Sequence, residues 1–181
     1  MRLHPRMHYA AQAGCLGLFL AIGSAWIGPK FTRASYQSKD AVLCEALRYL
    51  RAEIQVYQTE HSNSTPGYAA RDESALAWTS DDLPDAAPPD SETFVRQLTQ
   101  FTDAAGHVKP SRCAPCDLGP YLIGIPQNPF TLKSGVWVVD QDQMPPLDQS
   151  KPYGWIYNAR TGQLIANLTG IDSYGVAYAN Y

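Results

Sequence analysis

The first 33 residues of this 181-residue chain contain no acidic side chain, although they hold Arg2, Arg6, Lys30 and Arg33. All seventeen Asp and Glu lie further along, beside ten Lys and Arg, so the rest of the chain carries a formal charge of −7. Nucleic acid binding depends on an excess of positive charge, so this balance argues against nucleic acid as a partner of the folded part. The hydrophobic content of 45% is nevertheless high enough for a globular core.

Charge is also missing from residues 9–28, YAAQAGCLGLFLAIGSAWIG, which is about the length needed to cross a bilayer as a helix. Arg2 and Arg6 precede this run, which predicts a cytoplasmic N-terminus and places the remainder outside the cytoplasm. The alternative is a cleaved secretory signal, with Gly23-Ser24-Ala25 as the small-residue cleavage site. We expect the membrane helix, because the apolar run continues into the helical sequence that follows.

A second helical pattern occupies residues 36–61. Apolar side chains recur there every three or four residues and predict one buried stripe: Val42, Leu43, Ala46, Leu47, Leu50, Ile54 and Tyr57. We therefore expect one long helix over residues 9–61, bent near Gly28-Pro29. This divides the chain into an anchor, residues 1–28, and a globular head, residues 29–181.

Downstream, the pattern predicts an α+β fold. Residues 66–92 form an acidic, proline-containing surface excursion, and Asp90 caps a short helix that ends near Gly106. Residues 135–140, GVWVVD, form a strand, and residues 154–167, GWIYNARTGQLIAN, form a hairpin whose turn places Gly162 at positive φ. We expect a small antiparallel sheet, with the stripe of helix 36–61 covering its apolar face.

The segment GPYLIGIPQNPF, residues 119–130, combines large apolar side chains with prolines at 120, 126 and 129. Proline excludes both a helix and a central strand here. We expect an ordered loop whose apolar side chains seal the edge between helix and sheet. The tyrosines of the last eleven residues, Tyr174, Tyr178 and Tyr181, are expected to pack on the head or to form a subunit contact.

Several blocks, in this order, resemble the type IV pilin-like proteins, and most of all the G-type major pseudopilins of type II secretion. They are IGPKFTRAS, LRYLRAEIQVYQTEH, FVRQLTQFTDAAG, GPYLIGIPQNPF and GWIYNARTGQLIAN. The resemblance implies a helix that anchors the subunit in the bacterial inner membrane and then packs in the core of a filament. It also implies a periplasmic head, an assembling role and no enzymatic activity.

One part of the family pattern is absent. Counted back from Pro29, which matches the family's helix proline, the processing site falls between Met7 and His8, and Gln12 takes the place of the usual glutamate. The proposed role of that glutamate is to meet a charged N-terminus in an apolar filament core, and a neutral amide cannot supply this charge. The processing peptidase of the family reads a small residue before the cut, whereas Met7 stands there and no glycine lies between Met1 and Ala13, so we expect the N-terminal segment to be retained.

Cys113 and Cys116 form the single CxxC pair of the chain. A structural disulfide, a redox pair and half of a zinc site are all compatible with this spacing, but no second CxxC or HxxxH supplies further zinc ligands. Pro115 and the following Gly119-Pro120 indicate a loop rather than a helix N-terminus, so for a protein outside the cytoplasm we predict a disulfide. Cys15 and Cys44 are interpreted as small core residues.

The family resemblance also implies a calcium-binding loop between strands. Asp140, Asp142 and Asp148 are its candidates here, although they supply too few oxygens alone and also fit a solvated loop. The four histidines, His4, His8, His61 and His107, are scattered and are interpreted as surface residues.

The sequence thus predicts a structural subunit of a pseudopilus or type IV pilus-related assembly, without a cofactor other than possible calcium. Its partners would be copies of itself, other pilin-like subunits and membrane components of the secretion system. The alternative is a membrane-tethered periplasmic binding or thiol-redox protein that shares the head fold.

Overall fold

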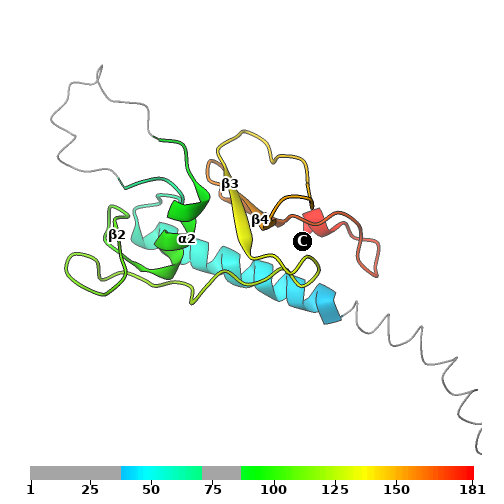
Figure 1. The fold of residues 1–181 in the computed structure, drawn as a ribbon, viewed down its shortest axis with the longest axis horizontal. Coiled ribbons are helices and arrows are strands. Elements are labelled where there is room, and N and C mark those ends of the chain that lie inside the picture. Colours follow the sequence, from blue (N-terminus) through cyan, green and yellow to red (C-terminus); the bar gives the residue numbers. More distant parts are fainter. Residues whose placement is uncertain (1–37, 71–86) are drawn as a thin grey trace, which may run out of the picture.

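The computed structural model describes residues 38–70 and 87–181, and Figure 1 shows their arrangement. The predicted membrane segment, Gln12, Pro29 and most of the acidic excursion lie outside the described residues. Within residues 38–70 and 87–181, no helix has both the length and the apolar composition needed to cross a membrane.

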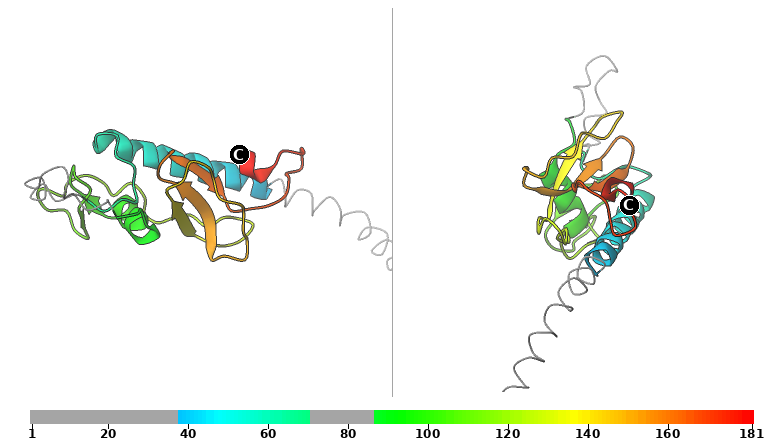
Figure 2. Two further views of the ribbon diagram at one scale, coloured as in Figure 1. Left: turned by 90° about the horizontal axis from the view of Figure 1, so that it is seen from above. Right: turned by 90° about the vertical axis from the view of Figure 1, so that its right-hand side faces the viewer.

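The first helix, described over residues 38–60, lies along the sheet (Figures 1 and 2). Its buried side chains join one hydrophobic core with those of the sheet and of the second helix: Leu43, Leu47, Leu50, Ile54 and Tyr57. The predicted covering of the sheet is confirmed. The expectation for Val42 was wrong, because this side chain is 51% exposed. Val42 lies about 100° around the helix from Leu43 and so leaves the buried stripe.

The main sheet has three strands in the order β3-β4-β5, with β3 at Gly135–Val139, β4 at Tyr153–Asn158 and β5 at Gln163–Ala166. β4 and β5 are antiparallel, as predicted for the hairpin. β3 and β4 are parallel, so the expectation of a wholly antiparallel sheet was wrong. Parallel neighbours need a crossover of a dozen or more residues, and residues 140–152 are long enough to supply it.

The hairpin turn forms as expected. Gly162 has φ +72°, and its N–H donates to the carbonyl oxygen of Asn158 at 2.8 Å. The buried Asn158 side chain accepts from the N–H of Arg160 at 3.1 Å and donates to the carbonyl oxygen of Gln141 at 2.7 Å. One amide thus fixes both the turn and the start of the crossover.

Helix α2, Ser91–Thr99, begins at the predicted cap, where Asp90 Oδ1 accepts from the N–H of Thr93 at 2.9 Å. It ends at Thr99 rather than near Gly106, so the expected end was wrong. The chain becomes extended at Gln100 and enters β1, Phe101–Thr102, which pairs with β2, Val108–Lys109. Strand pairing at Thr102 therefore replaces the last expected helical turns.

The proline-containing loop bridges α2 and the main sheet. The N–H groups of Tyr121 and Leu122 both donate to the carbonyl oxygen of Leu98, at 3.0 and 2.8 Å. At its other end, Trp155 Nε1 donates to the carbonyl oxygen of Pro126 at 2.8 Å. Tyr121 and Leu122 are buried as expected, but Ile123 is fully exposed, so the expectation that every apolar side chain of the loop seals the edge was wrong.

The tyrosines near residue 181 divide between packing and exposure. Tyr178, in the short 3-10 helix η2, Tyr178–Asn180, is buried and donates from its hydroxyl to Asp40 Oδ1 at 2.9 Å. Tyr181 packs beside it, with ring centroids 5.5 Å apart. Tyr174 is exposed. Packing on the head is therefore confirmed for Tyr178 and Tyr181.

Candidate functional site

The predicted cysteine pair lies in an exposed turn after β2. Cys113 and Cys116 pair as an isolated antiparallel bridge, in which the N–H of Cys113 donates to the carbonyl oxygen of Cys116 at 3.1 Å. Both are free thiols in the structure. Cys113 is exposed, whereas Cys116 is 2% exposed. The disulfide between them stays a prediction.

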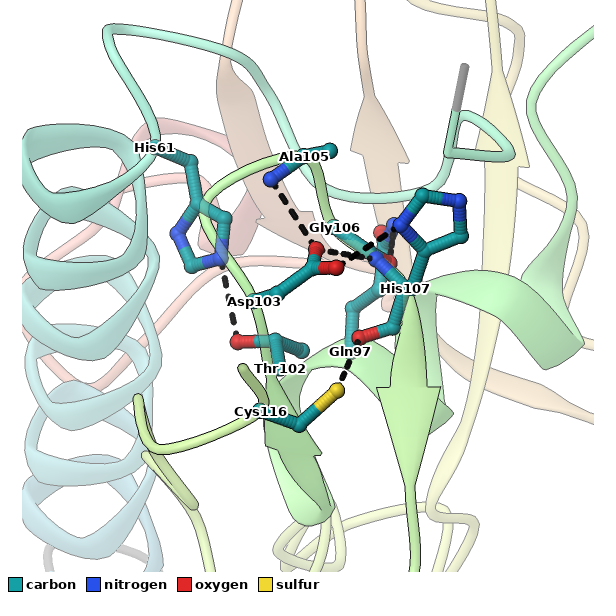
Figure 3. Close-up of polar contacts among 8 residues, drawn as sticks. All are labelled: His61, Gln97, Thr102, Asp103, Ala105, Gly106, His107 and Cys116. Carbon is teal, nitrogen blue, oxygen red and sulfur yellow. Dashed lines mark hydrogen bonds and ion pairs between the residues drawn. The ribbon is translucent and has the colours of Figure 1, made fainter. Parts of the chain in front are cut away.

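The Cys116 thiol points into the head and donates to the carbonyl oxygen of His107, with a sulfur to oxygen distance of 3.7 Å (Figure 3). Burial raises the pKa of this thiol, and the charges of Asp103 and Cys113 act in the same direction. Since the ordinary pKa of a cysteine already lies above neutrality, Cys116 stays protonated at pH 7.

Asp103 organises the turn that carries His107. Its Oδ1 accepts from the N–H groups of Ala105 and His107 at 3.0 and 2.9 Å, and its Oδ2 lies 2.9 Å from His107 Nδ1. Burial alone would raise the pKa of Asp103, but these hydrogen bonds and the charge of His107 outweigh it and lower the pKa. The carboxylate therefore acts as the acceptor that closes the turn from residue 103 to residue 107.

Gln97 joins this turn to the segment after the first helix. Its Nε2 donates to the carbonyl oxygens of Gly106 and Tyr68 at 3.2 and 2.9 Å, and its Oε1 accepts from the N–H of Gly67 at 2.8 Å. The side chain is buried and makes three hydrogen bonds to main-chain groups. Gln97 therefore holds together segments far apart in the sequence.

His61 was expected on the surface, and that expectation was wrong, because its side chain is 1% exposed. Nδ1 lies 2.8 Å from the carbonyl oxygen of Tyr57, which can only accept, so Nδ1 carries the proton. Nε2 is then free to accept from the hydroxyl of Thr102 at 3.0 Å. His61 follows Tyr57 by four residues and so continues the buried stripe, which is the sequence signal that could have revealed it.

The three aspartates considered for calcium are not brought together. Asp140 and Asp142 both bind Arg160, with Oδ1 of Asp140 2.6 Å from Nε and Oδ1 of Asp142 3.2 Å from a terminal guanidinium nitrogen. Asp148 instead accepts from the hydroxyl and N–H of Ser150 at 2.5 and 2.9 Å.

Asp148 also lies at the opposite end of β4 from the other two aspartates. Its N–H donates to Asn167 Oδ1 beside the start of β4, whereas Asp140 follows Val139, which pairs with Asn158 at the end of β4. Over residues 38–70 and 87–181, no three His, Cys, Asp or Glu side chains are placed to hold a metal ion.

The first helix carries a second set of apolar side chains on its exposed side. Val42, Tyr49 and Val56 recur every seven residues and are 51%, 44% and 43% exposed. Val42, Ala46, Tyr49 and Ala52 line an open hollow on this side, together with the charged side chains of Glu45 and Arg48. We call the five residues Val42, Ala46, Tyr49, Ala52 and Val56 the outer stripe. Cys44, expected in the core, is also exposed on this helix.

Comparison of the chain with protein-family models, with curated proteins and with solved structures found no match.

Proposed function

We propose that this chain is a structural subunit of a pseudopilus or type IV pilus-related assembly, anchored in the bacterial inner membrane with its head in the periplasm. Its role in this proposal is assembly with further copies or other pilin-like subunits, rather than catalysis. The sequence blocks that resemble the G-type pseudopilins support it. The observation that carries it is the outer stripe of the first helix.

The outer stripe has the spacing of a helix that packs on another helix. Side chains seven residues apart lie on one face, and Ala46 and Ala52 fill the positions between Val42, Tyr49 and Val56. Small residues between larger ones allow a neighbouring backbone to approach closely. The stripe is centred about 120° from the buried face of the same helix, so the head leaves it uncovered except at Ala46, which is partly buried and packs against the core as the sequence predicted.

Tyrosine is enriched at protein interfaces, and apolar side chains that share one exposed helix face can be buried by a partner. The occupant we propose is the first helix of a second copy. Two identical helices can then bury the same residues on each side, and repeated addition of one subunit requires in addition that the two copies be staggered along the helix, because an in-register pair closes into a dimer.

Photochemical cross-linking tests this proposal. A benzophenone amino acid introduced at Tyr49 in the full-length chain should capture a second copy, and mass spectrometry should locate the cross-link within residues 38–60 of that copy. The same group at Gln55, which is exposed about 120° from the buried face on the other side of the helix, is the matched control and should give far less dimer.

Assembly itself gives a second measurement. Filaments sheared from cells should contain the unmodified chain and the Gln55→Glu variant, but not the Tyr49→Glu variant, because a buried unpaired carboxylate is unfavourable at an apolar contact. Equal dimer from positions 49 and 55, or filaments that incorporate Tyr49→Glu normally, would overturn the proposal.

A further inference from the structure

The two thiols of the CxxC turn differ strongly in access to solvent. Cys113 is exposed, together with its neighbours from Ser111 to Pro115, whereas the side chain of Cys116 is 2% exposed. Only Cys113 can therefore be reached by a reagent in solution without a change in the fold. Thiol–disulfide exchange needs such access, because a thiolate must approach the disulfide sulfur directly.

The turn also brings the two residues close enough to be joined. They are paired directly across an antiparallel bridge, with the N–H of Cys113 on the carbonyl oxygen of Cys116 at 3.1 Å. Hydrogen-bonded antiparallel pairs have Cα atoms about 5.5 Å apart, inside the range of about 4.4 to 6.8 Å seen for disulfides. Closure therefore needs side-chain rotation rather than rearrangement of the chain.

We propose that this turn is a thiol–disulfide exchange site with a fixed order of reaction: Cys113 reacts first with an external organic disulfide, and Cys116 then closes the internal bond. The geometry that points to it is an exposed thiol and a buried thiol on the two sides of one turn. This inference does not depend on the proposed assembly function.

The Cys113 thiol loses its proton, and its thiolate attacks one sulfur of the external disulfide, forming a mixed disulfide and releasing one thiolate. The Cys116 thiol then loses its proton and attacks Cys113 Sγ, which forms the internal bond and releases the second thiolate. Two protein thiols are oxidised, the external disulfide is reduced to two thiols, and the two protons go to those thiols or to solvent.

The surroundings of Cys116 disfavour the first step, and the nearness of Cys113 in the same turn favours the second. Its S–H donates to the carbonyl oxygen of His107, and burial together with nearby negative charge raises its pKa. An external disulfide therefore meets a shielded, protonated thiol at this position. Once Cys113 carries the mixed disulfide, its sulfur is held within the same turn as Cys116. The high local concentration of this sulfur lets Cys116 attack it although Cys116 is shielded from solvent.

The experiment uses the full-length chain with Cys15→Ser and Cys44→Ser, so that only the paired thiols remain, and glutathione disulfide as the probe. Two further variants each retain a single thiol: Cys116→Ser retains Cys113, and Cys113→Ser retains Cys116. Intact-mass measurement over time follows the addition of glutathione. We expect Cys113 in the first variant to react at least ~10-fold faster than Cys116 in the second, because access controls the rate.

The same two variants in concentrated urea provide the matched control, since the unfolded chain exposes both thiols. The difference in rate should then shrink to about 2-fold or less, which would assign it to the fold. The chain that retains both thiols should lose two hydrogens and keep no glutathione.

Equal native rates for the two variants, faster reaction at Cys116, or a paired chain that stops at the mixed disulfide would each overturn the proposal. Circular dichroism of both variants identifies any that has lost the fold. If the Cys113→Ser variant has lost the fold, alkylation of the chain that retains both thiols by iodoacetamide under native conditions replaces this comparison. We then expect Cys113 to be modified at least ~10-fold faster than Cys116, and equal modification would contradict the inference.

Discussion

The imidazole ring of His61 stacks on the phenol ring of Tyr57, with ring centroids 3.8 Å apart and ring planes inclined by 10°. Tyr121 meets both rings edge-on, at 5.4 Å from Tyr57 and 6.1 Å from His61. This group joins the end of the first helix to the proline-containing loop. The hydrogen bond from Thr102 to His61 adds β1 to the same junction.

We expect His61→Ala to lower the free energy of unfolding by about 3 kcal/mol, because it leaves a cavity beside Tyr57 and removes both hydrogen bonds of the ring. Thr102→Val, which removes the hydroxyl partner of Nε2 and a hydrogen-bond partner of Tyr121, should cost about 1 to 2 kcal/mol. Urea unfolding followed by circular dichroism measures both. A loss below about 0.5 kcal/mol for His61→Ala would contradict a structural role for the buried ring.

Gly154 lies where another segment passes too closely for a side chain. A Cβ atom there would be 2.1 Å from the carbonyl oxygen of Lys133, which also accepts from the N–H of Asn128. Gly154→Ala should therefore destabilise the head by about 3 kcal/mol or more. Gly124→Ala is the matched control, because nothing lies within 4 Å of its Cβ position, and its effect should stay within about 0.5 kcal/mol. Similar thermal unfolding of the two variants would contradict this close approach.

The local elements could be predicted from the sequence, because each depends on nearby residues. Asp90 caps its helix, Gly162 takes positive φ in its turn, and β-branched and aromatic residues mark the strand at residues 135–139. The parallel pairing of β3 and β4 depends instead on the path of residues 140–152, which contain no periodic pattern. Periodicity shows which residues can share a face but not which distant strand lies next to them.

Parts of the candidate site could not be predicted from residues close together in the sequence. The CxxC spacing identified Cys113 and Cys116, but their opposite exposure follows from packing of the turn against Asp103 and His107. Asp140 and Asp142 have a spacing compatible with metal ligands, but Arg160 in the turn of the hairpin binds them instead. The spacing of residues along the sequence does not predict long-range contacts of this kind.

Acid should weaken the turn that Asp103 closes. The pKa of Asp103 is lowered in the folded chain, so the unfolded chain binds more protons, and stability falls as the pH drops below about 4. This contribution is present above the ordinary aspartate pKa and is lost as the pH falls through the lowered folded value. Asp103→Asn should therefore show a shallower loss of stability between pH 5 and pH 2, about the range over which such a group titrates. Identical slopes in urea unfolding at each pH would show that Asp103 contributes nothing to acid sensitivity.

Arg51 connects the first helix to β5 and to the segment near residue 181. Its Nε and a terminal nitrogen donate to the carbonyl oxygen of Leu164 at 3.2 and 2.7 Å, and the terminal nitrogen also donates to the main-chain oxygen of Tyr181 at 2.5 Å. Burial lowers the pKa of Arg51, but a guanidinium stays charged at neutral pH, so these hydrogen bonds are charge-assisted.

Arg51→Met keeps much of the apolar stem and removes every donor, so we expect a loss of about 1 to 2 kcal/mol and faster amide hydrogen exchange in residues 177–181. Arg48→Met is the matched control, because Arg48 is exposed and forms an ion pair with Glu45 on the same helix at 2.6 Å. Its cost should stay below about 0.5 kcal/mol, since exposed ion pairs contribute little. If exchange in residues 177–181 rises equally in both variants, or in neither, the hydrogen bonds from Arg51 do not hold this segment in place.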